Sequence, residues 1–173
     1  MTAMTRFLLP FALAATLAWS SVAPAAEPYL PAFEVLDADS LPVGVHELGM
    51  GGNWLLAVVD GGLPSARRFL DALGSKNERF GSNVVVLVLG TAEQFDALRL
   101  SYARLGEVRW LRAHNPALLA SLGLTGVPAR IALHPDGRIA SRRAGLGRGP
   151  DEVARQVRAW AGSSTGGESG DSQ

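Results

Sequence analysis

No cysteine occurs among the 173 residues of this sequence. Disulfide exchange, reduction and isomerisation are therefore excluded for this chain acting alone, and so is the chemistry of a peroxidatic cysteine. The chain also lacks the disulfides that often stabilise small domains in oxidising compartments. It relies on its core instead, because 47% hydrophobic residues at this length are enough for one well-packed domain.

Net charge is absent as well. The sequence has 16 Lys and Arg residues against 16 Asp and Glu residues, so its formal net charge is zero. This balance argues against nucleic acid or another polyanion as a partner. Arg142 and Arg143 form the only tight basic pair near a predicted turn, and we expect both side chains to be solvated.

Long apolar runs are missing except near the N-terminus. There, Phe7–Trp19 is continuously apolar and follows the positive charge of Arg6. An Ala-Pro-Ala sequence ending at Ala25 then supplies the small residues that signal peptidase needs. The pattern predicts a secretory signal peptide over residues 1–26, cleaved near Ala25 or Ala26, and a periplasmic protein.

An uncleaved membrane anchor is the alternative interpretation of this segment. The apolar run falls short of the ~20 residues that span a bilayer, and Pro10 interrupts it. We therefore expect no stable membrane insertion after signal cleavage.

Hydrophobic periodicity and turn residues predict one domain over residues 27–161. Its first part, up to residue 53, is rich in Pro and Gly and predicts short strands and turns. The later elements, in chain order, are a strand at Trp54–Asp60, a helix from Pro64 to Gly74, a strand at Asn83–Gly90, a helix at Glu93–Leu105 capped by Thr91, a short connecting strand at Val108–Leu111, a helix from Asn115 to Gly123, strands at Arg130–His134 and Arg138–Arg142, and a helix at Asp151–Trp160. Residues 162–173 are too polar and too rich in Gly and Ser to fold, and predict a disordered tail.

The order of these elements predicts an α/β fold with a mixed central sheet. Strands joined by helices are expected to be parallel, and the two late strands to form an antiparallel hairpin across Pro135-Asp136-Gly137. The strand at Asn83–Gly90 is apolar on both faces, which is typical of the middle of a sheet covered by helices on both sides.

Three passages of the sequence, residues 31–48, 54–73 and 121–146, resemble the thioredoxin superfamily and most of all its exported TlpA/ResA-type, redoxin-like branch. They read PAFEVLDADSLPVGVHEL, WLLAVVDGGLPSARRFLDAL and SLGLTGVPARIALHPDGRIASRRAGL. The first is similar to the branch's N-terminal hairpin, the second to its strand, active-site loop and first helix, and the third to its C-terminal hairpin with the preceding Gly-x-x-x-x-Pro. No single motif is diagnostic, and the resemblance depends on their order and spacing.

The resemblance implies a thioredoxin-like three-layer sandwich and a cis peptide bond between Val127 and Pro128. In the family this loop lies beside the active-site loop and offers backbone groups to an extended peptide, which is strand-type recognition. The alternative from the residues alone is that Pro128 is simply the first residue of an edge strand, where proline is permitted.

The sequence departs from the family at the active-site loop, residues 61–65. The family places Cys-x-x-Cys at the start of the first helix, where the helix dipole lowers the thiol pKa. Here either Gly62 and Ser65 or Leu63 and Ala66 occupy the cysteine positions, and neither register supplies a thiol.

Other chemistry in this loop has little support in the sequence. Ser65 is the one residue resembling a nucleophile, and we expect it to cap the helix or lie on the surface because no base adjoins it except Asp60. We interpret Asp60 as a residue that caps the turn before Gly61-Gly62. The three histidines, His46, His114 and His134, have no metal-ligand spacing, so neither a metal nor a cofactor is expected.

The sequence therefore predicts an exported thioredoxin-fold protein that binds an envelope protein or an extended peptide without catalysis. Its expected binding surface consists of Gly61, Gly62, Leu63, Pro64, Ser65, Val127 and Pro128. The alternatives are a thiol-independent, glutathione-dependent enzyme centred on Ser65, and a scaffold in an envelope machine such as cytochrome maturation or conjugative transfer. Trp54, Trp110 and Trp160 are predicted to be core residues rather than the lining of an exposed groove.

Overall fold

A computed structural model describes residues 29–48 and 51–162 of the chain. The predicted signal peptide, and the predicted tail apart from Gly162, lie outside these described residues.

One mixed sheet of seven strands organises the described chain, in the order β2-β1-β5-β4-β3-β6-β7. Its strands are β1 (Glu34–Leu36), β2 (Pro42–Gly44), β3 (Trp54–Asp60), β4 (Val84–Leu89), β5 (Arg109–Ala113), β6 (Ala129–Leu133) and β7 (Ile139–Ala144). The central strands β3, β4 and β5 are parallel to one another, whereas β6 is antiparallel to β3 and β7 is antiparallel to β6. The predicted mixed sheet is confirmed.

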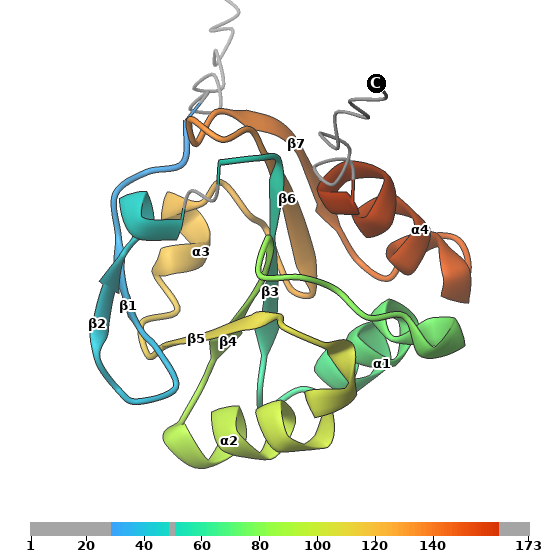
Figure 1. Cartoon of the computed structure of the whole chain (residues 1–173). Helices are drawn as coiled ribbons and strands as arrows, with labels where there is room; N and C mark the ends of the chain where they lie inside the picture. Colours follow the sequence, from blue (N-terminus) through green and yellow to red (C-terminus); the bar gives the residue numbers. More distant parts are fainter. Residues whose placement is uncertain (1–28, 49–50, 163–173) are drawn as a thin grey trace, which may run out of the picture.

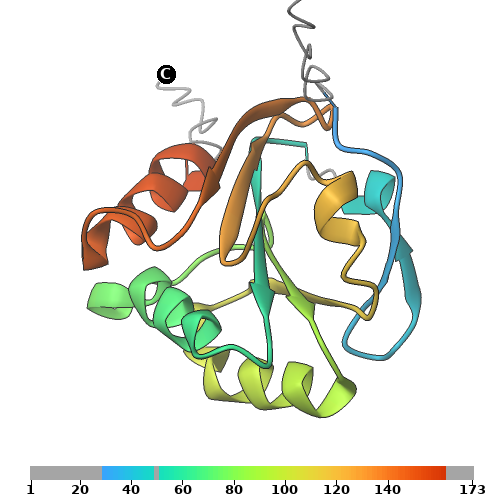
Figure 2. The same cartoon turned by 180° about the vertical axis from the view of Figure 1, so that it is seen from behind.

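Four α-helices pack around the sheet: α1 (Pro64–Leu73), α2 (Ala92–Ser101), α3 (Leu118–Ser121) and α4 (Pro150–Ala161). Figures 1 and 2 show α1 and α4 on one side of the sheet and α3 on the other, with the β1–β2 hairpin at the edge of the sheet beside α3. The two hydrophobic clusters follow the same division, because the apolar side chains of α1, α2 and α4 belong to one and those of α3 to the other.

Side chains along β3 and β4 alternate between the two hydrophobic clusters. Leu55, Ala57 and Val59 face α1 and α4, while the residues between them face α3. Every residue of β4 is buried. Strands that are apolar on both faces take central places in a sheet covered on both sides, as the sequence predicts.

The structure differs from the predicted order at β5. The sequence suggests only a short connecting strand there, yet β5 is an interior strand, parallel to β4 and paired with β1 on its other side. Arg109 and Arg112 interrupt its apolar pattern, which conceals the strand. The predicted helix over Glu93–Leu105 also ends earlier: α2 stops at Ser101, and a short 3-10 turn over Ala103–Leu105 follows.

Candidate functional site

The two predicted binding segments lie at the same edge of the sheet. Because β3 and β4 are parallel, their carboxyl ends share one edge, and antiparallel β6 begins there. Val58 pairs with Ala129, so the residues after β3 and those before β6 are neighbours in register. We call the surface formed by residues 61–65 and Val127–Pro128 the candidate edge.

Backbone hydrogen bonds hold the first residues of this edge. The Gly61 N–H donates to the Leu89 carbonyl at 2.8 Å, which ties the loop to the end of β4. The Asp60 carboxylate accepts from the Gly62 N–H, also at 2.8 Å. The prediction that Asp60 caps this turn is therefore confirmed.

The first glycine position is required by the close approach of α2. A Cβ atom at Gly61 would lie 2.9 Å from the Gln94 Cβ and 3.2 Å from a Val88 methyl group. At Gly62 the nearest atom would be the Gln94 Nε2, at 3.2 Å, which is the end of a flexible side chain. If Gly62 and Ser65 occupy the cysteine positions, a side chain at Gly62 would therefore be crowded by Gln94 but not excluded.

Helix α1 begins at this edge without a side-chain cap. Leu63 is its N-cap residue, in the extended conformation that a residue before proline prefers, and Pro64 opens the helix. Of the two roles expected for Ser65, helix capping is not found, because Ser65 stands one residue inside the helix and Leu63 is the N-cap residue, and Ser65 is instead partly exposed. Leu63 is 45% exposed, so the edge presents an apolar side chain to solvent.

The opposing segment contains a cis peptide bond between Val127 and Pro128, the isomer that the resemblance implies. Pro128 is buried, and its carbonyl accepts from the Gly145 N–H at 2.8 Å. Val127 is half-buried against the α3-side core. Within residues 29–48 and 51–162, nothing forms a hydrogen bond with the backbone N–H or carbonyl of Val127.

The ionisable groups near this edge serve the local structure. In the first turn of α2, the Thr91 hydroxyl lowers the pKa of Glu93, so that carboxylate is held charged and is no base poised near neutral pH.

No group of three or more His, Asp or Glu side chains in the described part of the chain is arranged to hold a metal ion. None of the described helices combines the length and the apolar character that crossing a bilayer requires.

The sequence did not predict a second cluster of polar side chains, which lies between α4 and strands β6 and β7. Arg143 is exposed, as predicted, whereas Arg142 is half-buried, because the two residues follow one another in β7 and point to opposite faces. Arg142 Nε donates to the Leu122 carbonyl at 3.0 Å, whereas Arg143 lines a cavity together with Arg130 and Trp160. Trp54 is a core residue as predicted, but Trp160 is only half-buried and faces this cavity.

No protein-family model matches the sequence, and no curated protein matches it. Solved structures do match. The thioredoxin domain of a thiol-disulfide oxidoreductase from Bacteroides vulgatus superposes with a TM-score of 0.59 at 17% identity, over 80% of this chain and 99% of that one. A thiol:disulfide interchange protein from a Bacteroides species gives a TM-score of 0.57 at 15% identity, over 85% and 95% of the two chains. A secreted disulfide oxidoreductase from Mycobacterium tuberculosis gives 0.55 at 16% identity, over 73% and 95%.

These likenesses show the fold. The chain has a thioredoxin-like fold, with its mixed sheet and flanking helices, as the resemblance predicts. The similar structures are named as thiol-disulfide oxidoreductases, and this chain has no cysteine.

Proposed function

We propose that this chain is an exported protein that binds an envelope protein or an extended peptide at the candidate edge, without thiol chemistry. The absence of cysteine carries the proposal. It removes the reaction for which the similar structures are named, while the fold and the edge remain. A surface left in place without its chemistry is best explained by binding.

Two features of the edge support recognition of an extended chain. The unbonded backbone N–H and carbonyl of Val127 are the groups that strand-type recognition uses, because a bound peptide would satisfy both. Beside them, Leu63 offers an exposed apolar contact. Backbone pairing would supply affinity, and the contact with Leu63 would select the partner's side chain.

Export is part of the proposal. The predicted signal peptide over residues 1–26 supports a periplasmic location, and one of the similar structures is that of a secreted protein. The glutathione-dependent alternative has less support, because no contact among the described residues supplies Ser65 with a general base.

A pull-down with a matched pair of variants tests the binding surface. Leu63→Ser removes the apolar side chain at the candidate edge, and Leu100→Ser removes one that is 69% exposed on α2. The purified chain and both variants are immobilised and exposed to a periplasmic extract, and retained proteins are quantified by mass spectrometry. We expect a partner that the unaltered chain and Leu100→Ser retain and that Leu63→Ser loses.

Pro128→Ala is the second variant, used after a thermal melt has shown that it folds. Loss of the same partner would support an edge that includes both segments. Retention unchanged by both Leu63→Ser and Pro128→Ala would contradict the assignment of the site.

A further inference from the structure

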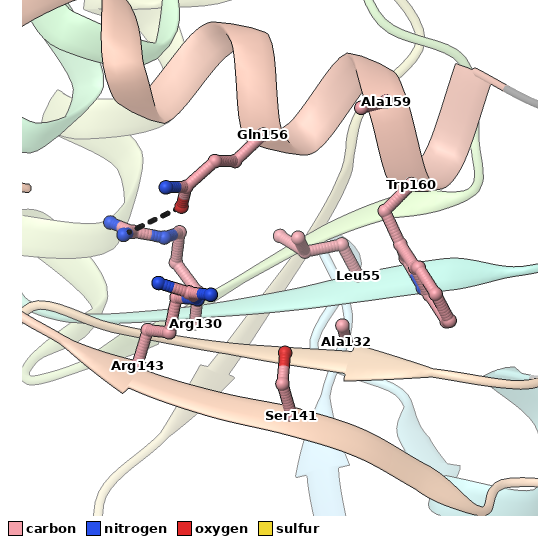
Figure 3. Close-up of a pocket in the computed structure, with 8 residues that line it drawn as sticks. All are labelled: Leu55, Arg130, Ala132, Ser141, Arg143, Gln156, Ala159 and Trp160. Atoms are coloured by element: carbon pink, nitrogen blue, oxygen red, sulfur yellow. Dashed lines mark hydrogen bonds between the residues drawn. The ribbon is translucent and has the colours of Figure 1, made fainter.

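A cavity of about 230 Å³ lies between α4 and the strands β3, β6 and β7. Its lining, drawn in Figure 3, is Leu55, Arg130, Ala132, Ser141, Arg143, Gln156, Ala159 and Trp160. None of these residues belongs to the candidate edge. The cavity is smaller than the roughly 300–1,000 Å³ of sites for drug-sized ligands, which points to a small molecule.

A buried arginine forms one end of this cavity. The residues on either side of Arg130, Ala129 and Ile131, face the α3-side core, so Arg130 faces α1 and α4. On that face the neighbouring strands β3 and β4 contribute only apolar side chains to the core. A charged residue in such a position is costly unless something compensates its charge.

Neutral groups hold the guanidinium of Arg130, a residue that is only 4% exposed. Nη1 donates to the Gly145 carbonyl at 2.9 Å, and Nη2 donates to the Gln156 Oε1 at 3.1 Å. The guanidinium also stands 5.9 Å from the centre of the Phe69 ring. These contacts orient the side chain but leave its positive charge without an anionic partner.

Arg143 adds a second positive charge directly opposite the first. Arg130 and Arg143 are cross-strand partners in the β6–β7 register, a position in which like charges repel. Burial lowers the pKa of Arg130, and the charge of Arg143 lowers it further, while Glu152 acts in the opposite direction. Neither guanidinium forms an ion pair with any carboxylate in the described part of the chain.

Glu152, the acid that acts on the pKa of Arg130, already accepts hydrogen bonds from other groups. Glu152 accepts from the Gln156 amide at 2.6 Å and from the backbone N–H of Arg148. Gln156 in turn contacts Arg130, so the carboxylate makes no direct hydrogen bond with the arginine and acts on its charge only from a distance. The positive end of the cavity is therefore left for an anion from outside the described chain.

The other end of the cavity is apolar and rigid. Leu55, Ala132 and Trp160 line it, and the Trp160 indole N–H donates to the carbonyls of Trp54, at 3.1 Å, and Leu133, at 3.2 Å. These bonds fix the indole ring. Between the two ends, the Ser141 hydroxyl points into the space under α4 (Figure 3).

We propose that this cavity binds a small organic carboxylate. Its carboxylate group lies between Arg130 and Arg143, within reach of the Ser141 hydroxyl, and its apolar body lies against Leu55 and Trp160. Arginine suits this role because its planar guanidinium matches a carboxylate with two parallel N–H donors. The bound anion also relieves the repulsion between the two opposed guanidinium groups.

Calorimetric titration of the full chain with phenylacetate tests the proposal, with phenylacetamide as the neutral control of the same shape. We expect saturable binding of the carboxylate, a shift of the Trp160 indole N–H signal in NMR spectra, and no measurable binding of the amide. Equal binding of the two compounds would overturn the proposal. Inorganic phosphate binding as tightly as phenylacetate would also overturn it, because the apolar end of the cavity would then have no role.

Two arginine variants locate the site. Arg143→Gln removes the exposed guanidinium that has no partner and should raise the Kd for phenylacetate by about 10-fold or more. Arg155→Gln makes the same charge change at an exposed position of α4 outside the cavity and should leave the Kd unchanged. Equal effects of the two variants would overturn the assignment. Leu63→Ser should also leave the Kd unchanged, so failure here and failure of the candidate edge are distinguishable.

Discussion

Two helices begin at the same edge of the sheet and do so in opposite ways. Helix α2 starts with a capping box, in which the Thr91 hydroxyl accepts from the Gln94 N–H and the Gln94 side chain accepts from the Thr91 N–H. Helix α1 has Leu63 as its N-cap residue, and this exposed apolar side chain makes no capping hydrogen bond. The first arrangement serves stability. The second leaves the start of the helix without a side-chain cap.

The difference teaches where this chain departs from its fold. The core strands, the cap of α2 and the packing of Gln94 against Gly61 are consistent with a stable domain. The starts of α1, α3 and α4 all lack a side-chain cap, and among them α1 begins beside the candidate edge.

Gly61→Ala should have the largest effect, because it breaks the contact between the two helix starts. The new methyl group would stand 2.9 Å from the Gln94 Cβ, close to the backbone of α2, so the helix must shift. We expect the free energy of unfolding to fall by about 1–3 kcal/mol, measured by urea denaturation. Gly126→Ala is the control: a Cβ atom there meets nothing within 4 Å. Equal losses in the two variants would show that the contact with Gln94 is unimportant.

Removing the side-chain cap of α2, or adding one to α1, should have a smaller effect on the free energy of unfolding. Thr91→Ala removes the side-chain hydrogen bond at the start of α2 and should lower the free energy of unfolding by about 1 kcal/mol.

Leu63→Ser introduces a capping hydroxyl at the start of α1 and should raise the free energy of unfolding by about 0.5–1 kcal/mol. Thermal or urea unfolding of both variants checks the signs.

A Leu63→Ser variant that is destabilised would mean that Leu63 packs for stability, and the contrast between the helix starts would fail. A variant that is more stable yet loses the partner would sharpen the contrast, since the leucine would then be kept for binding alone.

Tyr102→Phe should have the smallest effect, and it concerns the other ends of the two helices. The Tyr102 hydroxyl at the end of α2 lies 3.0 Å from the Asp71 carboxylate and 3.1 Å from the Arg67 carbonyl on α1. Losing this hydrogen bond should lower the free energy of unfolding at neutral pH by about 0.5–1 kcal/mol.

The pH dependence of the stability difference between the unaltered chain and Tyr102→Phe tests the physical cause of that difference. Burial, aided by Asp71, raises the pKa of Tyr102 above its ordinary value of about 10. The folded state therefore favours the protonated phenol, and the hydroxyl's contribution is complete below the unfolded pKa and is lost as the pH rises through the folded one. Urea denaturation between neutral pH and pH about 11 should show the advantage of the unaltered chain over Tyr102→Phe disappearing. An advantage that stays constant would contradict this cause.

Most of the fold could be predicted from local pattern. The limits of β3 were predicted to the residue, because its apolar run ends at Gly61-Gly62. The Asp60 turn follows from local hydrogen bonding, and the Thr91 cap does too. Strand β5 was underrated, since its arginines hide its place in the interior of the sheet.

The candidate edge could be predicted only through the resemblance. Residues 61–65 and Val127–Pro128 lie far apart along the chain, and the β3–β6 pairing brings them to one edge. That the backbone groups of Val127 find no partner among the described residues could not be foreseen, because their state depends on what the neighbouring segments leave unpaired.

The sequence by itself determined that this chain performs no thiol chemistry, and it determined the buried strands, since composition and periodicity are local properties. Only the tertiary structure decided that Arg130 faces Arg143 and that Gly61 meets Gln94. The first contact depends on strand register, because a shift of one residue would turn Arg130 to the other face of the sheet, and the second depends on where α2 packs. Such contacts arise when distant segments pack together, and no pattern within a single segment specifies them.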